Sequence, residues 1–151
     1  ANDGIRVTPT LVAGYTGADG TYQEAPAPST TRVVSERTAD TVLAMLESVV
    51  SDEGTAPGAA IPGYRVAGKT GTANRIDDSC GCYRGYTASF IGIAPADDPR
   101  LVVAVFLQNP RNGHYGGVLA GPVFKRVTTY GLEHLRIPPS GTPRPKLPVE
   151  W

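Results

Sequence analysis

Apolar residues recur along the chain at two different spacings, which predict both helices and strands. Downstream of Ser35 they follow helical spacing, so we expect a helix with Ser35 as its N-cap that ends before Gly54. A second helical series predicts a helix over residues 118–135, with Pro122 in its first turns, where proline is best tolerated. The apolar stripe of each helix indicates core packing.

The stretches between the two predicted helices read as strands over residues 66–73, 86–94 and 101–107. Their short connections predict an antiparallel meander. The third strand is apolar without alternation, which predicts that both of its faces are covered. Residues 74–85, between the first two strands, are polar, and we expect them to form a loop.

The two ends of the chain carry no long periodic pattern. Residues 1–34 contain many turn formers and predict turns with short extended pieces. Residues 138–151 hold five prolines in fourteen positions, and we expect this tail to be extended or disordered. The predicted division is therefore a folded part over residues 1–137 and a tail over residues 138–151.

Composition restricts the classes of protein and of partner. The chain has 151 residues, which is enough for one domain with a core. Fourteen Lys and Arg balance fourteen Asp and Glu, so no net charge favours nucleic acid or a membrane surface. The sequence has no apolar run long enough to span a bilayer and no signal peptide at its start. Because it begins abruptly, we expect it to be a piece of a longer protein.

The only two cysteines, Cys80 and Cys82, are separated by one glycine. A disulfide across one residue is strained, but glycine helps the tight geometry. Only His114 and His134 remain as partners for a metal, and the spacing fits no common zinc finger, so we expect no metal site. A disulfide that pins the loop and two thiols without a role remain as alternatives.

The candidate chemistry lies in the segment Val66-Ala-Gly-Lys-Thr-Gly-Thr-Ala73. In a pleated strand Thr70 and Thr72 project to one side, while Lys69 and Gly71 project to the other. Glycine inside a strand indicates that a ligand or another backbone comes close. The segment therefore predicts a strand edge that docks an anionic, peptide-like ligand by strand addition.

Two motifs fit these letters. Residues 63–70 match the phosphate-binding P-loop pattern, and residues 69–71 match K-T-G, the third motif of the serine penicillin-recognising enzymes. A P-loop follows a buried apolar strand, and its lysine opens a helix. Here Pro and Gly precede the lysine and Gly71 follows it, so the sequence context favours K-T-G.

Further segments resemble the C-terminal half of the transpeptidase domain of class B penicillin-binding proteins, in the same order and spacing over residues 1–138. The matching segments are Val49-Val50 with Gly54-Thr55-Ala56, Val66-Ala-Gly-Lys-Thr-Gly-Thr-Ala73, Ala88-Ser-Phe-Ile-Gly-Ile-Ala-Pro95 and Tyr115-Gly-Gly-Val-Leu-Ala-Gly-Pro-Val-Phe124. The last segment is most similar to the septal, cell-division members. The resemblance implies an α+β fold in which helices flank a five-stranded antiparallel sheet, with three strands supplied here and the Lys69 strand at the edge.

The resemblance also implies roles for site residues. The backbone of Thr72 would help to bind the oxyanion, the hydroxyls of Thr70 and Thr72 would bind the substrate carboxylate, and Lys69 would assist both binding and proton transfer. Gly71, between the two threonines, would also belong to the substrate-binding edge, and Tyr115 would form a wall of the pocket. No serine in the chain has lysine three residues later or asparagine two residues later, so we expect the nucleophile to lie outside it.

The implied function is that of a D,D-transpeptidase that cross-links peptidoglycan stem peptides ending in D-Ala-D-Ala and binds β-lactams, with no cofactor. Expected partners are the remainder of the transpeptidase domain and division proteins, and no nucleic acid. The expected location is the outer face of the bacterial plasma membrane, with the anchor in a segment outside this chain. A non-catalytic β-lactam sensor and, less favoured, a P-loop nucleotide-binding protein are the alternatives.

Overall fold

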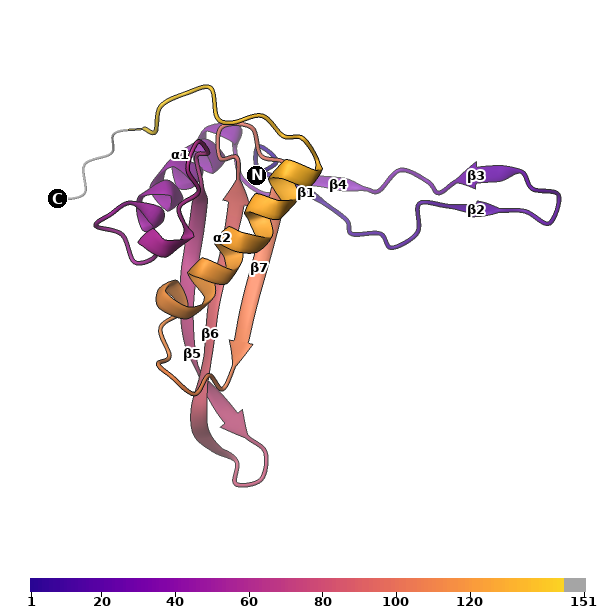
Figure 1. Cartoon of the computed structure of the whole chain (residues 1–151). Helices are drawn as coiled ribbons and strands as arrows, with labels where there is room; N and C mark the ends of the chain where they lie inside the picture. The colour runs from indigo at the N-terminus through magenta and orange to yellow at the C-terminus, as the bar shows by residue number, and fades with distance from the viewer. Residues whose placement is uncertain (146–151) are drawn as a thin grey trace. The chain divides into compact units, whose positions relative to one another are not determined.

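The computed structural model describes residues 1–145, which contain helices and antiparallel strand pairs, so the fold class is α+β as predicted (Figure 1). The chain divides into two compact units, one of residues 2–40 and one that begins at Thr41. The second unit carries the candidate site. Within the described residues, no helix combines the length and the apolar character needed to cross a membrane.

The first unit consists of two short antiparallel ribbons and the start of a helix. Strand β1 pairs with β4, and β2 pairs with β3. The four strands are β1 (Ile5–Val7), β2 (Gly14–Thr16), β3 (Tyr22–Glu24) and β4 (Thr30–Arg32). Each has three residues, in line with the short extended pieces expected in this region.

Helix α1 (Glu36–Glu47) begins where the sequence predicts. The backbone N–H of Thr38 donates to the hydroxyl oxygen of Ser35 at 3.2 Å, which confirms Ser35 as the N-cap. The helix then tightens into a short 3₁₀ turn, η1 (Ser48–Val50), before Gly54.

The second unit is built on three antiparallel strands in the order β5–β6–β7, which confirms the predicted meander and leaves β5 at an edge. The strands are β5 (Ala67–Asp77), β6 (Cys82–Ala94) and β7 (Leu101–Gln108). The prediction of a loop over residues 74–85 is wrong, because β5 and β6 continue as a two-stranded ribbon beyond the end of β7 (Figure 1). Both faces of that ribbon are solvated, so it carries no apolar alternation for the sequence to reveal.

Strand β7 has one covered face and one open face among the described residues, so the prediction of two covered faces is not met within this chain. Its residues alternate, with Val105 buried but Val102 and Phe106 exposed at 63% and 57%. On the neighbouring strand Ile91 is also exposed, and it pairs with Ala104 of β7. Exposed apolar faces of this kind commonly mark interaction surfaces.

The covered face of the sheet carries the hydrophobic core. Helix α2 (Gly116–His134) lies across this face, and the rings of Phe90 on β6 and Phe124 on α2 meet edge to face at 4.9 Å (Figure 1). Small residues around the 3₁₀ turn η2 (Pro57–Ala59) complete the core from the α2 side. The helix position agrees with the predicted 118–135 to within two residues at its start.

Two residues of the predicted tail are hydrogen-bonded to the second unit. The hydroxyls of Ser140 and Thr142 donate to the two carboxylate oxygens of Asp97 at 2.6 and 2.9 Å. Burial disfavours ionisation of Asp97, but these two hydrogen bonds, a backbone hydrogen bond and the charge of Arg65 together hold the pKa of the carboxyl below its ordinary value. For residues 146–151 the expectation of an extended or disordered tail lies outside the described residues.

The side chain of Arg65 connects the tail to α1. It donates from Nε to the buried carboxylate of Glu47 at 3.0 Å, makes a second bond from Nη2 to the same group, and donates from Nη1 to Thr142 at 2.7 Å. A bidentate pair of this kind fixes both partners in direction as well as in distance.

Candidate functional site

Strand β5 presents Lys69, Thr70 and Thr72 at the free edge of the sheet. Residues directly opposite each other in an antiparallel ladder share a face. Thr70 pairs with Phe90 and therefore lies on the face that α2 covers, and Thr72 follows on the same face. Lys69 pairs with the exposed Ile91 on the open face. The structure thus gives the alternation expected from the sequence.

The Lys69 side chain is exposed and bends along the strand, so that its Nζ donates to the backbone oxygen of Thr70 at 2.9 Å. In a strand, the N–H and C=O groups of one residue point toward the same edge of the strand, and those of the residue two positions on point toward that edge as well. The exposed ammonium of Lys69 reaches the backbone oxygen of Thr70, so this oxygen is consistent with pointing toward the free edge. The N–H of Thr72 then points to the same edge.

Each of the two threonine hydroxyls has a partner from another element. The hydroxyls of Thr70 and Thr55 lie 3.4 Å apart, and the backbone N–H of Gly116 donates to the hydroxyl of Thr72 at 3.3 Å. Thr55 follows η1, and Gly116 is the first residue of α2. Three separate parts of the chain therefore meet at the two hydroxyls.

Sequence reasoning did not assign a role to Thr55 or Gly116, although both lie in the segments that carry the family resemblance. Their contacts with β5 span fifteen and forty-four positions of the sequence. The sequence did show a pair of glycines before an apolar helix. Such a pair indicates that another backbone comes close, but it does not indicate which segment that backbone belongs to.

Tyr115 is the N-cap residue of α2 and is 63% exposed. Its ring lies 4.3 Å from the ring of His114, which in turn stacks on Tyr86 at 4.6 Å. Since Tyr115 directly precedes Gly116, the structure brings it close to Thr72. Its role as a pocket wall stays a prediction.

Lys69 lies within a strand, and its neighbours on both sides belong to that strand. The phosphate-binding P-loop needs a lysine at the start of a helix, whose N-terminal N–H groups hold the phosphates. The structure lacks that geometry at Lys69, which removes the basis for the nucleotide-binding alternative.

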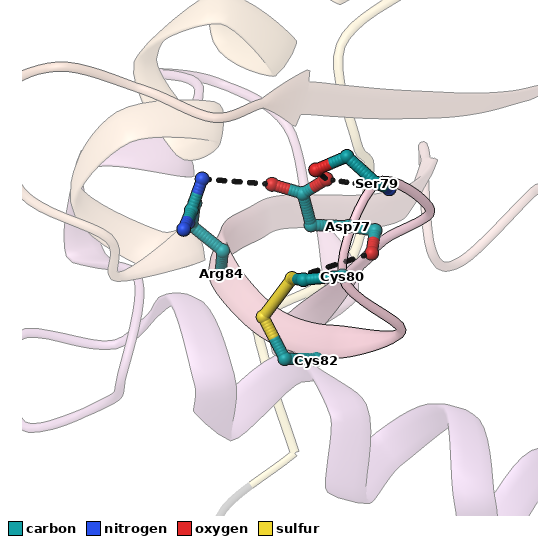
Figure 2. Close-up of a disulfide and its surroundings, with 5 residues drawn as sticks. All are labelled: Asp77, Ser79, Cys80, Cys82 and Arg84. Atoms are coloured by element: carbon teal, nitrogen blue, oxygen red, sulfur yellow. Dashed lines mark hydrogen bonds and ion pairs between the residues drawn. A yellow bond between two sulfur atoms is a disulfide. The ribbon is translucent and has the colours of Figure 1, made fainter.

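Cys80 and Cys82 are joined by a disulfide at the tip of the β5–β6 hairpin. Figure 2 shows the bond beside Asp77, whose carboxylate accepts from the hydroxyl of Ser79 at 2.6 Å and pairs with Arg84 at 3.2 Å. The bond belongs to the turn, since Asp77 and Cys82 face each other in the ladder. It is separated along the strand from Thr72.

The described residues contain no group of three or more His, Cys, Asp or Glu side chains that could hold a metal. They do form an open surface hollow of about 570 Å³ beside the tail, with Arg65 and Lys125 among its lining residues. Because Lys69, Thr70 and Thr72 are absent from that lining, the hollow is not part of the candidate site.

Comparisons with known proteins identify the family. Residues 1–129 match the penicillin binding protein transpeptidase domain. The chain is 41% identical over 160 residues to penicillin-binding protein PbpB of Mycolicibacterium smegmatis, covering 99% of this chain and 25% of that protein. It is 40% identical over 119 residues to the probable peptidoglycan D,D-transpeptidase PenA of Neisseria gonorrhoeae, covering 78% of this chain and 20% of that protein.

The fold agrees with the sequence match. The crystal structure of penicillin binding protein 3 from Mycobacterium tuberculosis, complexed with ampicillin, superposes with a TM-score of 0.85 at 40% identity, over 95% of this chain and 34% of that one. The chain spans about a quarter of the length of the curated relatives that it matches. It belongs to the penicillin-binding-protein transpeptidase domain family, in the class B branch that the sequence predicted.

Proposed function

We propose that this chain forms one wall of the acyl-transfer site of a D,D-transpeptidase that cross-links peptidoglycan stem peptides. Two relatives about 40% identical to this chain are named probable peptidoglycan D,D-transpeptidase PenA, and one solved relative is complexed with ampicillin. The observation that carries the proposal is the arrangement at the free edge of β5. There the Lys69 ammonium reaches the backbone oxygen of Thr70, and the hydroxyls of Thr70 and Thr72 contact Thr55 and the first residue of α2. A substrate chain can add at this edge as a further strand.

Substrate and β-lactam share a carboxylate, and this edge is suited to bind it. Thr70 and Thr72 each offer a hydroxyl, and the charge of Lys69 lies one residue away on the same strand. Hydrogen bonds to a charged acceptor are shorter and stronger than neutral ones. The three groups together orient the end of the stem peptide along the strand.

The reaction places negative charge on the carbonyl oxygen of the penultimate D-Ala. A serine oxygen attacks this carbon, the terminal D-Ala leaves, and an amine of a second stem peptide then attacks the acyl-serine. Backbone N–H groups that are already fixed in direction stabilise such an oxyanion best. The N–H of Thr72, directed to the free edge of β5, serves as one donor.

The serine nucleophile comes from outside this chain, because no serine here has lysine three residues later. The open apolar face of β6 and β7, with Ile91, Val102 and Phe106, is where the remainder of the transpeptidase domain packs. The chain alone is therefore expected to be inactive, with no β-lactam adduct on any of its serines.

The biological setting follows from the class of reaction. Stem peptides are cross-linked outside the plasma membrane, so the complete protein acts on the outer face of that membrane, with an anchor outside this chain and division proteins as partners.

A non-catalytic sensor that is acylated but does not transfer the acyl group is the second candidate. Release of the acyl group to an added amine acceptor separates the two, since only the transpeptidase supports it.

Lys69→Ala in the complete protein tests the proposal. Loss of one charge-assisted contact costs about 1.5–3 kcal/mol, so the second-order constant for acylation by a fluorescent penicillin should fall about ten- to hundredfold. The melting temperature should hardly change, because exposed charges contribute roughly 0–1 kcal/mol to stability. Lys69→Arg should restore only part of the rate, since a planar guanidinium does not replace a compact ammonium.

Lys125→Ala is the matched control, because Lys125 lies in α2 and lines the hollow away from β5. It should leave acylation unchanged. Equal losses of rate and stability in Lys69→Ala would make Lys69 a structural residue and would remove the main support for the proposed site.

A further inference from the structure

The N-terminal end of α2 touches both strands that form the site edge. Gly116 lies so close to them that a Cβ atom in its place would come within 3.0 Å of the backbone oxygens of Ser89 on β6 and Gly71 on β5. Real Cβ atoms essentially never make such contacts, and neither oxygen belongs to a side chain that could turn away. The start of the helix is therefore in direct backbone contact with the strand between the two threonines.

The next residue makes the corresponding contact with the segment after η1. A Cβ atom on Gly117 would come within 3.0 Å of the backbone oxygen of Thr55. Thr55 itself is held in place, because the N–H of the following residue, Ala56, donates to the backbone oxygen of Val49 at 2.8 Å. One helix end thus fixes the relative position of β5 and of Thr55.

These contacts place a polar partner on each β5 hydroxyl. A hydroxyl has one proton to donate and two lone pairs to accept with. At Thr72 the oxygen accepts from the N–H of Gly116, so the proton of this hydroxyl stays available for another acceptor. At Thr70 the 3.4 Å contact with Thr55 allows the same arrangement when Thr55 is the donor.

We propose that Thr55 is a positioning residue for the transpeptidase site: its hydroxyl donates to Thr70 and thereby directs the Thr70 proton toward the carboxylate of the stem peptide or β-lactam. Gly116 does the same for Thr72 through its backbone N–H. Both donors are set before the ligand arrives, so binding needs little reorientation of the hydroxyls. The inference rests on the proposed function, because it assumes that Thr70 and Thr72 meet a carboxylate.

Thr55 is suited to a test because its side chain is exposed and lies outside the core. Thr55→Val keeps the shape and removes the hydroxyl, and Thr55→Ser keeps the hydroxyl. In the complete protein, the kinetics of acylation by benzylpenicillin separate the dissociation constant from the rate constant of the chemical step. The methyl ester of the same penicillin serves as a ligand without the charge.

For Thr55→Val we expect the dissociation constant of benzylpenicillin to rise about two- to tenfold, the effect of one hydrogen bond, with a smaller change in the chemical rate constant. The constants for the methyl ester should change by less than twofold. Thr55→Ser should recover the wild-type values. The same Thr-to-Val change at Thr31, an exposed threonine of β4, is the matched control and should have no effect.

Three results would overturn the proposal: unchanged kinetics in Thr55→Val, equal impairment of Thr55→Val and Thr55→Ser, or equal losses for the acid and the ester. Equal losses together with a lower melting temperature would assign Thr55 a purely structural role. Failure of the proposed function has a different signature, since the wild-type protein would then not be acylated or Lys69→Ala would have no effect.

Discussion

The β5–β6 hairpin is held in two different ways along its length. In its site half, residues 67–73 and their partners 87–93, a third strand continues the sheet and α2 covers one face. In its tip half, residues 74–86, only the two strands and their turn remain. The first half is fixed by residues distant in sequence, and the second by groups within a few positions of one another.

The boundary between the halves is a β-bulge. Between the pairs Asn74–Tyr86 and Ile76–Tyr83, β6 has one residue more than β5, and Gly85 takes a positive φ of 77°. Bulges of this kind bend the strand and interrupt the ladder. We therefore predict that the site geometry depends on packing against α2 and does not depend on the tip.

The largest expected effect comes from Gly116→Ala. The added Cβ meets two backbone oxygens, so α2 must move away from β5. We expect a stability loss of about 1–3 kcal/mol from overpacking. A shift of the site by about 1 Å should lower the acylation constant about hundredfold. Thermal unfolding and penicillin acylation of the complete protein measure the two effects.

Gly131→Ala in the same helix is the control. There a Cβ would lie 3.1 Å from Cδ1 of Leu101, a side-chain atom that can give way, and alanine is favoured over glycine inside a helix by about 1 kcal/mol. This variant should keep full activity. Normal acylation by Gly116→Ala would show that the close approach of α2 does not set the site.

A smaller effect is expected when the disulfide is removed by Cys80→Ser with Cys82→Ser. The closed loop is very short, so loop-closure entropy limits the stabilisation to about 1–2 kcal/mol. Amide hydrogen exchange should become faster in the tip half alone. The acylation constant should stay within about twofold of wild type.

A marked loss of acylation in the double variant would contradict the comparison, because the tip would then support the site. Reduction of the wild-type protein by dithiothreitol provides a second route to the same state, without a change of sequence. The reduced protein and the double variant should show the same pattern of amide hydrogen exchange.

The smallest expected effect is the titration of Asp77. Hydrogen bonds from the hydroxyl of Ser79 and then from its backbone N–H hold the pKa of this carboxyl below its ordinary value. The contribution to the turn is therefore complete above the unfolded pKa of about 4 and is lost as the pH falls through the lower folded pKa. The NMR amide signal of Ser79 should move with a midpoint below about 4.

Asp77→Asn serves as the reference, in which that step of the Ser79 signal should disappear. The amide of Gly116, in the site half, should not follow the same step. A midpoint at or above the ordinary Asp value, or a Gly116 signal that moves together with Ser79, would show that the two halves are not independent.

The sequence predicted the elements that bury an apolar face. The meander, the N-cap Ser35 and the extent of α2 followed from periodicity, connection length and capping, which are local signals. The edge position of β5 followed from the family resemblance. The sequence prediction failed for the tip half, because two solvated strands have no buried face to mark them. It predicted cover on both faces of β7, and within the described residues one face, with Val102 and Phe106, is exposed.

Part of the candidate site was likewise predicted from local signals, and part was not. Lys69, Thr70 and Thr72 follow from one motif and from strand alternation. The partners of the hydroxyls, Thr55 and Gly116, depend on which distant backbone reaches β5, and a single sequence does not encode that in any pattern that can be read locally. The disulfide was one of two alternatives because spacing alone does not bring two sulfur atoms together.

The glycine pair at the start of α2 also limits how this region can vary in nature. Every replacement of Gly116 or Gly117 introduces at least a Cβ atom, so no series of small steps leads away from glycine at these two positions. Tyr115, one residue earlier, has an exposed ring and can be altered gradually in size and polarity. We therefore expect substitutions to be tolerated at the rim of the site and not at the junction beneath it.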